Sequence, residues 1–398
     1  MSLTVSIDVE TSTPASIGWY EPSKQDPVGL RASEVKGLWR WWSRVCIAGA
    51  MYDLGLLRGK PVEGNLIGPD KAEIKAVSYL VGKILGLGYA GEEGSEASRF
   101  TIHISASEAR LRKIKLKALA NLLQRPRLLT IKQDIEGIDR GSRFTIVVRR
   151  RVPKYPDAEE LALKILYLAI QLSGLGKGSR RGMGSLDVIS ISGITLSYSG
   201  LRELLDEVYS GCIKIVENYK STCLKYLSPG QQLGIPPMPV LSKNKYQGNV
   251  NVAQVYIIEN VRFEDIHNFF LRSQRCRVLY NKSDCQDDLR KNLAAWVLGL
   301  PREQRGTGYS IATRGVSRRA SPILISYHSK RNSLGPGAFV SVFLSGDWPK
   351  VLEWRGAGSS SRKIVVDPQV LVNAYITAIN ELSKYLGSLG TSLRPVWP

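Results

Sequence analysis

Residues 157–191 read "DAEELALKILYLAIQLSGLGKGSRRGMGSLDVISI" and place three patterns in direct succession. Segment 157–174 repeats apolar residues at helical spacing, opens with an acidic turn and ends at a glycine, which predicts a helix. A glycine-rich loop follows at 174–184, and "SLDVISI" at 185–191 alternates as a strand does. The stretch therefore predicts a helix and a strand joined by a loop with little side-chain bulk.

The remainder of the N-terminal half completes a recognisable order of elements. Alternating and helical patterns predict the strands 3–10, 99–105 and 143–151 and the helices 34–54 and 72–85. Ser33 is positioned to cap the first of these helices, while segment 110–119 fits a strand and an amphipathic helix equally. Strand, helix, strand, strand, helix, strand is the order of a ferredoxin-like domain, here enlarged by insertions.

The C-terminal half has the same mixture of patterns without a visible sequence repeat. Helices are predicted at 201–220, 263–273, 285–300 and 367–386, and strands at 252–259, 321–329 and 338–345. We therefore predict an α+β protein of two ferredoxin-like (RRM-like) domains with insertions. The N-terminal domain, with the glycine-rich loop, would span 1–192 and a divergent second domain 193–398.

The net charge limits the kinds of partner. Among 398 residues, 55 are Lys or Arg and 35 are Asp or Glu, which gives a net charge of +20. Both halves are basic, which favours nucleic acid or an anionic membrane surface as partner. The N-terminus lacks the apolar core of a signal peptide and no run approaches the ~18 apolar residues of a membrane helix. We expect a soluble, cytoplasmic protein with no membrane partner.

Cysteine and histidine usage argues against two kinds of site. The five cysteines are odd in number and contain no C-x-x-C pair, which disfavours a disulfide framework and a zinc ribbon. Only His103, His267 and His328 are present. We therefore expect no metal site and no cofactor.

Two glycine motifs resemble nucleotide-binding loops but lack the required context. "GLGYAG" at 86–91 follows a helical pattern, whereas the dinucleotide fingerprint follows a strand and precedes a helix. "GLGKGSRRGMG" at 174–184 has Gln171 where a P-loop requires glycine and Gly178 where it requires Ser or Thr. Neither motif predicts nucleotide binding.

The helix that contains "RASEVKGLWRWWSRV", residues 31–45, carries aromatic and basic residues on different faces. On a helical wheel, Lys36, Arg40, Ser43 and Arg44 fall within about 100° of arc. Apolar residues, including three tryptophans, occupy the remaining circumference, which favours a core position for the tryptophans. The basic stripe fits a polyanion and fits a solvated surface equally.

The glycine-rich loop favours the polyanion. Its glycines let backbone amides approach a ligand closely, and its cations suit the phosphates of a nucleic acid backbone. The residues concerned are Gly176, Lys177, Gly178, Ser179, Arg180 and Arg181. We expect the cations of this loop and of the first helix to converge on one groove, a plain flexible turn being the alternative.

Two further basic stretches extend the predicted surface. Segment 110–154 holds fourteen basic and three acidic residues, among them Arg149, Arg150 and Arg151. Segment 302–319 holds five arginines and one glutamate and ends in Arg318 and Arg319. A solvated surface is the alternative, but basic stretches in both halves favour a long track for single-stranded RNA, bound through phosphates and stacked bases.

Two motifs together resemble the RAMP superfamily of CRISPR proteins. "GLRASEVKGLWRWW" is similar to that family's R-x-S-x-K-G-x-x-R helix, and "GLGKGSRRGMGSL" to its glycine-rich loop. The tryptophan-rich helix, "LGLP" at 298–301 and "RRASPILI" at 318–325 resemble the first-numbered subunits of type III-B (Cmr) effector complexes. The matched positions are Arg31, Ser33, Lys36, Gly37 and Arg40 in the helix and 174–184 in the loop.

The resemblance implies a double ferredoxin-like, non-catalytic subunit of a ribonucleoprotein for antiviral defence. It would bind the 3′ portion of the guide RNA, the target RNA paired to it, and other effector subunits.

Cutting in such complexes is attributed to other subunits, which use an aspartate in the loop after the first strand. Asp26 lies in that region, so a metal-dependent endoribonuclease is an alternative, although Asp before Pro27 is typical of a turn. A scaffold that contacts only proteins is a third possibility.

Overall fold

The computed structural model describes residues 3–21, 23–91, 94–106, 111–224, 227, 234–270, 287–304, 306–358 and 360–398. These residues form a mixed α/β architecture with three four-stranded antiparallel sheets and several two-stranded ribbons. Within them, no helix combines the length and the apolar content that crossing a bilayer requires.

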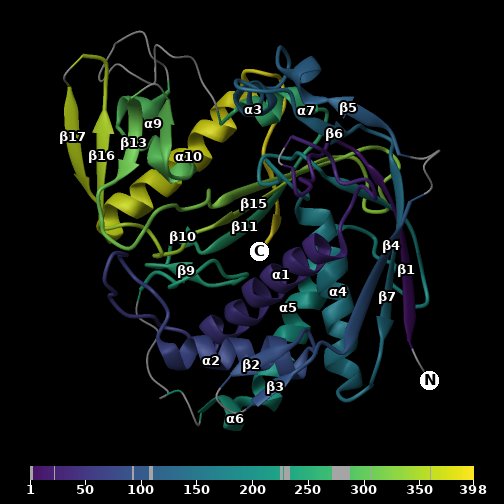
Figure 1. Cartoon of the computed structure of the whole chain (residues 1–398). Helices are drawn as coiled ribbons and strands as arrows, with labels where there is room; N and C mark the ends of the chain where they lie inside the picture. The colour runs from purple at the N-terminus through teal and green to yellow at the C-terminus, as the bar shows by residue number, and fades with distance from the viewer. Residues whose placement is uncertain are drawn as a thin grey trace.

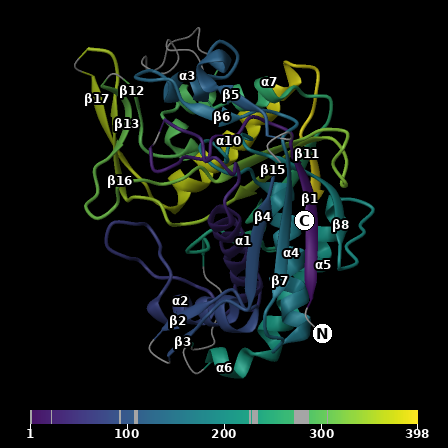
Figure 2. The ribbon, with the colours of Figure 1, turned by 45° about the vertical axis from the view of Figure 1, so that its right-hand side comes forward.

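The first sheet comes from the N-terminal half. Its strands are β1 (Thr4–Thr11), β4 (Phe100–Ser105), β7 (Arg143–Arg150) and β8 (Leu186–Ser192), in the order β4-β7-β1-β8. All neighbouring strands are antiparallel. The helix α1 (Ala32–Asp53) follows β1, and α4 (Pro156–Leu172) connects β7 to β8. Figure 2 shows β4, β7 and β1 side by side. The predicted order of elements in this half is present.

Insertions enlarge this half at two places. Between α1 and β4 come α2 (Lys71–Tyr79), a π-helical turn (Leu80–Ile84), and the hairpin of β2 (Tyr89–Gly91) and β3 (Gly94–Glu96). Between β4 and β7 come β5 (Lys113–Lys115), a 3₁₀ turn (Leu116–Leu119), α3 (Gln124–Leu129) and β6 (Glu136–Ile138). The ambiguous segment 110–119 thus divides between a short strand and a 3₁₀ turn, with residue 110 outside the described residues.

The second sheet repeats the strand order of the first. It comprises β11 (Ala253–Ile258), β14 (Ile323–His328), β15 (Gly337–Phe343) and β18 (Arg394–Trp397), in the order β14-β15-β11-β18. The short helix α7 (Phe263–Asn268) follows β11, and α10 (Pro368–Gly387) precedes β18. Counted along the chain, both sheets therefore place their second, third, first and fourth strands in succession.

The sequence analysis missed the third sheet. It is formed by β12 (Arg302–Gln304), β13 (Thr307–Ile311), β16 (Val351–Arg355) and β17 (Ser361–Val365), in that order. These strands are three to five residues long and interrupt the second domain at two separate places, so their patterns are too short to predict a strand. The sheet lies at the far end of the molecule from the N-terminus (Figures 1 and 2). A ribbon of β9 (Lys245–Tyr246) and β10 (Val250–Asn251) was also missed.

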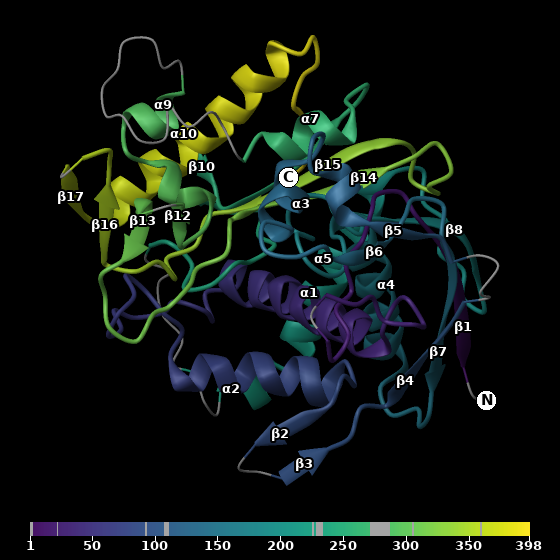
Figure 3. The same cartoon turned by 45° about the horizontal axis from the view of Figure 1, so that its top comes forward.

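Helices α1, α4 and α5 (Leu201–Asn218) form the centre of the molecule. They pack on one another, and α1 also contacts β4, while α4 contacts β8, β14 and β15. Figures 1 and 3 show α1 in the middle, with the first sheet on one side and strands of the second sheet on another. Strand β1 alternates between exposed and buried residues, whereas every residue of β15 is buried. The first sheet therefore keeps one open face and the second does not.

The main core does not divide at residue 192. Leu204, Val208 and Cys212 of α5 belong to the same buried cluster as residues of α1 and α4. Phe339 and Phe343 of β15 join this cluster as well. The boundary between 192 and 193 stays a prediction, and the first helix after it packs with the first half.

Two local predictions need correction. Ser33 does not cap α1, because the helix already includes Ala32 and its N-cap residue, Arg31, makes no side-chain cap hydrogen bond. The continuous helix predicted at 285–300 is instead α9 (Asp288–Lys291) and a 3₁₀ turn (Ala295–Leu298), since Leu293 between them has φ of 52°. Parts of the predicted helices 263–273 and 285–300, with Cys276 and Cys285, lie outside the described residues.

Candidate nucleic-acid interface

The first helix and the glycine-rich loop enclose one open depression. Its volume is about 490 Å³. It is lined by Ser16, Gly18, Glu34, Gly37, Leu38, Gly174, Leu175, Gly176, Lys177 and Ser179. The two segments therefore lie together, as the sequence analysis expects, although 130 or more residues separate them along the chain.

Backbone packing fixes the shape of the loop. Gly176 has φ of 81°, and a Cβ there would lie 2.4 Å from the carbonyl oxygen of Ser16. A Cβ on Gly184 would lie 2.1 Å from the carbonyl oxygen of Leu175. Side chains at these positions are excluded by the neighbouring backbone as well as by φ. The glycines therefore serve first to let the loop fold onto itself and onto the segment after β1.

Internal acceptors engage many of the loop's amides. The amides of Lys177 and Gly184 donate to Ser16 and Pro14. Within the described residues, the amides of Gly176, Gly178 and Arg180 donate to no protein acceptor. The prediction that loop amides can reach a ligand thus applies to these three groups.

Arg180 lies between the loop and the second half of the chain. Its Nη1 donates to the carbonyl of Ser321 at 3.0 Å, and its guanidinium lies 5.2 Å from the ring centroid of Trp41. Its own carbonyl accepts from the amide of Ile325. Burial, with a smaller contribution from nearby Arg319, lowers the pKa of Arg180 to about 10. Arg180 therefore joins the two halves and does not face the depression.

Arg181 makes a similar contact between the halves. Its guanidinium lies 5.2 Å from the ring of Phe270, and its carbonyl is 3.0 Å from Nδ1 of His267. The following residues, Gly182 and Met183, pack against Phe263. The expectation that all loop cations face one groove is thus corrected: Lys177 lines the depression, whereas the two arginines point into the junction of the halves.

The basic stripe of α1 lies next to the depression. Lys36 and Arg40 are half-buried and Arg44 is exposed. Burial, and then the charge of Arg40, lowers the pKa of both Lys36 and Arg44. Within the described residues, none of the three pairs with a carboxylate. The stripe is therefore a group of like charges that the protein itself does not neutralise.

Arg40 is held in place by the second glycine motif. Its Nε and Nη2 donate to the carbonyl of Leu87, within the "GLGYAG" segment. Arg40 and Arg44 also line a small pocket of about 120 Å³ with Ser78, Gly88 and Tyr89. The motif leads from a π-helical turn into β2, which agrees with its exclusion as a dinucleotide fingerprint.

The tryptophans of α1 are core residues, as predicted. Trp39 and Trp42 are buried and donate through Nε1 to the carbonyl of Ala162 and to Oγ of Ser173. Trp41 is half-buried and contacts Phe343 of the second sheet.

The three arginines at the end of β7 have different surroundings. Arg149 and Arg151 are exposed. Arg150 pairs at 3.3 Å with Glu159, a fully buried carboxylate that also pairs at 2.6 Å with buried Arg99. Arg99 further donates to the carbonyls of Lys83 and Ile84. Arg99 was missed in the sequence analysis because no local pattern shows that its partner lies 60 residues away.

Arg318 and Arg319 differ even more sharply. Arg318 is exposed, whereas Arg319 is buried, with 8% of its surface exposed. The Arg319 guanidinium pairs with Asp347 at 2.8 Å, donates to Oγ of Ser345 and lies 4.6 Å from the ring of Trp348. The placement of Arg319 on a basic surface is thus corrected: it is a core residue of the second half.

Arg31 and Asp26 satisfy each other. Nε of Arg31 lies 2.6 Å from Oδ2 of Asp26, and Oδ1 of Asp26 accepts from the amide of Val28. Asp26 is buried. Within the described residues, no group of three His, Cys, Asp or Glu side chains is arranged to hold a metal ion. The geometry fits the turn role considered for Asp26.

An exposed aromatic pair beside the depression was not predicted. Trp19 and Tyr20 follow Gly18 and are 40% and 86% exposed. Their ring centroids are 5.6 Å apart, and the Arg31 guanidinium lies 5.3 Å from the Trp19 ring. The adjacent aromatics "WY" in a proline- and glycine-rich loop were the available sequence signal.

Glu34 is the carboxylate of the depression. One of its oxygens, Oε2, is buried with no hydrogen-bond partner in the described structure. Burial raises the pKa of Glu34, nearby Arg31 opposes the rise, and Asp26 adds to it.

The open face of the first sheet lacks an aromatic platform. Its central side chain is Asp8, which accepts from Thr145 at 2.7 Å and Ser190 at 2.8 Å. The other exposed positions of its strands are polar or aliphatic, apart from His103. Among the described residues, exposed aromatic rings suited to stacking bases therefore lie in the loop after β1 and not on this face.

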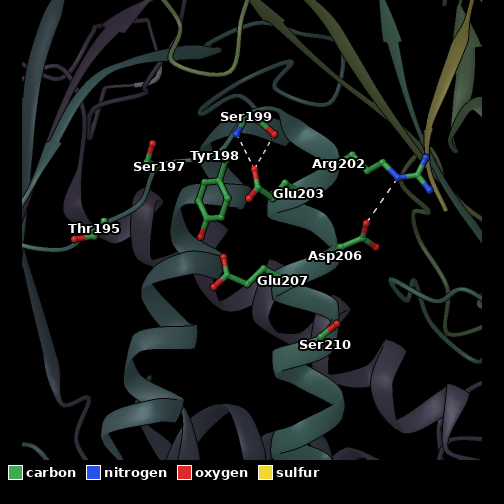
Figure 4. A pocket seen from close by; sticks show the side chains of 9 residues that line it. All are labelled: Thr195, Ser197, Tyr198, Ser199, Arg202, Glu203, Asp206, Glu207 and Ser210. Carbon is green, nitrogen blue, oxygen red and sulfur yellow. Dashed lines mark hydrogen bonds and ion pairs between the residues drawn. The ribbon is translucent and has the colours of Figure 1, made fainter.

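A second depression, larger than the one beside α1, does not suit RNA. It has a volume of about 800 Å³ and lies at the start of α5 (Figure 4). Three carboxylates line it, and each has a partner within the protein. Glu203 accepts from Ser199, Asp206 pairs with Lys243, and Glu207 pairs with Lys164. This cavity offers neither unpaired cations nor exposed aromatic rings.

Comparison with known proteins finds a family match in the N-terminal half. The model of the RAMP superfamily matches residues 8–187. The matched segment contains α1, the glycine-rich loop and all residues that line the 490 Å³ depression. No curated protein sequence matches the chain.

Solved structures extend the likeness to the whole fold. Apo Cmr1 from Pyrococcus furiosus matches with a TM-score of 0.52 at 17% identity, covering 99% of this chain and 98% of that chain. A chain of the type III-B Cmr-beta complex bound to cognate target RNA matches with a TM-score of 0.54 at 15% identity, covering 96% and 100%. A chain of Cmr-beta bound to cognate target RNA and AMPPnP, in the presence of ssDNA, has a TM-score of 0.55 at 14% identity and covers 96% and 100%.

Proposed function

We propose that this protein is a non-catalytic, RNA-binding subunit of a type III-B CRISPR effector complex. It would act in the cytoplasm in antiviral defence, beside other effector subunits. Its RNA ligands would be the 3′ portion of the guide RNA, the target RNA paired to it, or both. The match to the RAMP superfamily model and the fold shared with Cmr1 and with chains of RNA-bound Cmr-beta support this assignment.

The unpaired basic stripe on α1 is the observation that carries RNA binding. Burial, and then the charge of Arg40, lowers the pKa of Lys36 and Arg44, and none of the three cations has a carboxylate partner in the described structure. A phosphate backbone would relieve this repulsion, since it supplies anions at close spacing. Other lysines of the protein, such as Lys24 and Lys60, instead pair with carboxylates.

The stripe and the depression together form a track. Lys36 and Arg44 are eight residues apart, about 12 Å along a helix. The Lys36 end adjoins Gly37, which lines the depression with Lys177. A Cβ on Gly37 would meet no atom within 4 Å, so the helix backbone is open to a ligand there. We propose that single-stranded RNA follows α1 from Arg44 towards the glycine-rich loop.

Asp26 supports the non-catalytic assignment. Its two carboxylate oxygens already accept from Arg31 and Val28, which leaves little capacity for a divalent ion. The alternative of a metal-dependent endoribonuclease predicts cleavage of labelled RNA in Mg²⁺ that Asp26→Asn abolishes. Our proposal predicts intact RNA with both proteins, measured on denaturing gels.

We also infer that both halves are ferredoxin-like domains, spanning 1–192 and 193–398. Each contributes a four-stranded antiparallel sheet with the same strand order. Each places helical segments after its first and third strands. This order and connectivity are those of the split βαβ motif. The third sheet and the small hairpins would then be insertions.

A salt series of RNA binding tests the proposed function. Filter binding of single-stranded RNA should weaken steeply with salt, because each neutralised phosphate releases counterions. Lys36→Ala/Arg44→Ala should lower affinity and flatten the slope of log K against log salt by about 0.7 per lost phosphate contact. Single-stranded DNA, measured in parallel, reports how much the ribose contributes.

A matched pair of exposed lysines supplies the control. Lys330→Ala/Lys363→Ala removes the same two charges from exposed positions of the second half. This variant should keep the slope of the wild-type protein. An equal loss of RNA affinity in both double variants would mean that net charge alone, and not the stripe on α1, attracts RNA. Salt-insensitive capture of protein partners without RNA binding would support a scaffold instead.

A further inference from the structure

We propose that the depression between α1 and the glycine-rich loop is a nucleobase subsite, with Trp19 and Tyr20 as its stacking rim. The rings would stack a base of the single strand, and Glu34 would accept a hydrogen bond from an amino group on a base in the depression. This inference rests on the proposed RNA-binding function and adds which part of the RNA is recognised there.

The two rings of the rim are exposed, although backbone hydrogen bonds and a β-bridge hold their loop in place. The amide of Trp19 donates to the carbonyl of Lys24, and Gly18 forms a β-bridge with Gln25. The amide of Asp26 donates to the carbonyl of Ile17, which closes the same loop. Exposure of an apolar ring to water is unfavourable, yet the backbone of this loop holds two adjacent rings in contact with solvent. Such a preformed aromatic pair suits base stacking, since every base has a π-face.

Arg31 contributes to the rim without being a free cation. Its ion pair with buried Asp26 fixes the guanidinium 5.3 Å from the Trp19 ring. The ring is therefore supported on one side by a planar cation. A base stacked on the rim would extend an arrangement that the protein has already begun.

The depression offers a polar partner for a base edge. Glu34 lines the depression, and its Oε2 accepts no hydrogen bond in the described structure, so the carboxylate is not fully satisfied within the protein. An exocyclic amino group on cytosine, adenine or guanine would donate to this carboxylate from the depression, whereas uracil presents carbonyl oxygens on both sides of its imino group. Glu34 would disfavour a phosphate at the same place, so the base and not the backbone is expected to enter.

The space around Glu34 is compatible with such a ligand. Gly37, one turn along α1, leaves the helix backbone uncovered on this side. Gly176 and Lys177 form the opposite wall. The phosphates on either side of the base would then lie towards Lys177 and Lys36.

Anisotropy measurements with labelled oligocytidine and oligouridine of equal length test the subsite. Tyr20→Ala should weaken binding of oligocytidine about 5- to 100-fold, the range for loss of one stacked base, while Tyr20→Phe should bind as the wild type does. Wild-type protein should prefer oligocytidine by about fivefold or more, and Glu34→Gln should remove that preference. Glu63→Gln, the same charge change at an exposed position outside the depression, should keep it.

An abasic oligonucleotide separates stacking from other effects of Tyr20. On RNA that lacks the bases but keeps the phosphates, Tyr20→Ala should cause no further loss. Unchanged oligocytidine affinity in Tyr20→Ala, or an equal loss on abasic RNA, would overturn the subsite while leaving RNA binding in place. Failure of the wild-type protein to bind either oligonucleotide would instead overturn the proposed function. Because Tyr20 is 86% exposed, its substitutions should leave the circular dichroism spectrum unchanged.

Discussion

Adjacent residues in this chain can have opposite roles. Lys36 and Gly37 are neighbours, yet one belongs to the basic stripe and the other to the wall of the depression. Arg318 is exposed, and Arg319 is a buried partner of Asp347. The sequence shows the type of each residue. The direction in which its side chain points depends on the helix or strand that contains it and on the residues that pack against that element.

Gly37 is expected to favour function at the expense of helix stability. Glycine inside a helix costs about 1 kcal/mol relative to alanine, and a methyl group at Gly37 would meet no protein atom. Gly37→Ala should therefore raise the free energy of unfolding by about 0.5–1 kcal/mol and weaken RNA binding, because the methyl group occupies the ligand's space. Urea denaturation and filter binding measure the two effects.

Gly387→Ala is the matched control for this substitution. Gly387 also lies in a helix with open space at its Cβ, but at the end of α10. It should change stability in the same direction and leave RNA affinity unaltered. A Gly37→Ala protein that binds RNA as tightly as the wild type would exclude close approach of RNA to this part of α1.

The two arginines at 318–319 should respond differently to substitution. Arg319→Met leaves Asp347 without its cation and Ser345 without a donor, so we expect a loss of about 2–4 kcal/mol in the free energy of unfolding. Arg318→Met should stay within about 0.5 kcal/mol of the wild type, as exposed substitutions do. Urea denaturation distinguishes them. Comparable stabilities of the two variants would mean that Arg319 contributes no more than a surface residue.

At the scale of elements, ion pairs between residues far apart in the sequence connect the first insertion to the rest of the N-terminal half. Arg99 precedes β4 and joins three elements: the start of α4 through Glu159, the π-helical turn through two carbonyls, and β3 through Glu96. Glu159 has no exposed surface, and it also pairs with Arg150. Buried Arg99 thus links the hairpin β2–β3 to the rest of the N-terminal half, together with an ion pair between Lys154 and Glu96.

Removing Arg99 should lower the free energy of unfolding more than removing an exposed arginine from an ion pair of similar length. Arg99→Met leaves the buried Glu159 carboxylate short of a partner, and we expect a loss of about 3–5 kcal/mol in the free energy of unfolding. Arg143→Met removes an exposed arginine that pairs with Glu10 at 2.8 Å. That variant should lose no more than about 1 kcal/mol. Urea denaturation of both proteins under the same buffer conditions checks the ranking, and a reversed order would contradict it.

Across the whole molecule, the glycine-rich loop is a junction as well as a wall of the candidate site. Arg180 and Arg181 insert between the halves, and the amide of Ile325 in β14 donates to the loop. Buried His328 of β14 contacts Asp187 of β8 at 3.2 Å and the carbonyl of Gln171 at 2.7 Å. Because the loop makes these polar contacts with the second half, we expect it to be ordered only when the second sheet is present.

The N-terminal half should therefore not fold by itself. A fragment of residues 1–192 lacks α5, whose Leu204, Val208 and Ile215 complete the core around α1 and α4. We expect this fragment to aggregate or to lack near-ultraviolet circular dichroism, and the full chain to unfold in one urea transition followed by both tryptophan fluorescence and circular dichroism. A soluble fragment with native-like tertiary signals, or two separate transitions in the full chain, would show that the halves are independent.

Local features of this protein could be predicted from the order of its residues. Periodicity placed most helices and long strands correctly, the glycine pattern marked the loop, and the excess of Lys and Arg predicted a polyanionic partner. These features depend on residues near one another in the chain, so a short window contains their physical cause.

The pairing of individual cations with carboxylates could not be predicted in this way, because it depends on how the chain folds. Glu159 reaches Arg99 across 60 positions, Asp347 reaches Arg319 across 28, and the second half covers Arg180 and Arg181. The convergence of Gly37, Glu34, Lys177 and the Trp19–Tyr20 loop likewise joins segments that are far apart in the sequence. Burial and ion pairing depend on distances in space, and the folded core sets those distances.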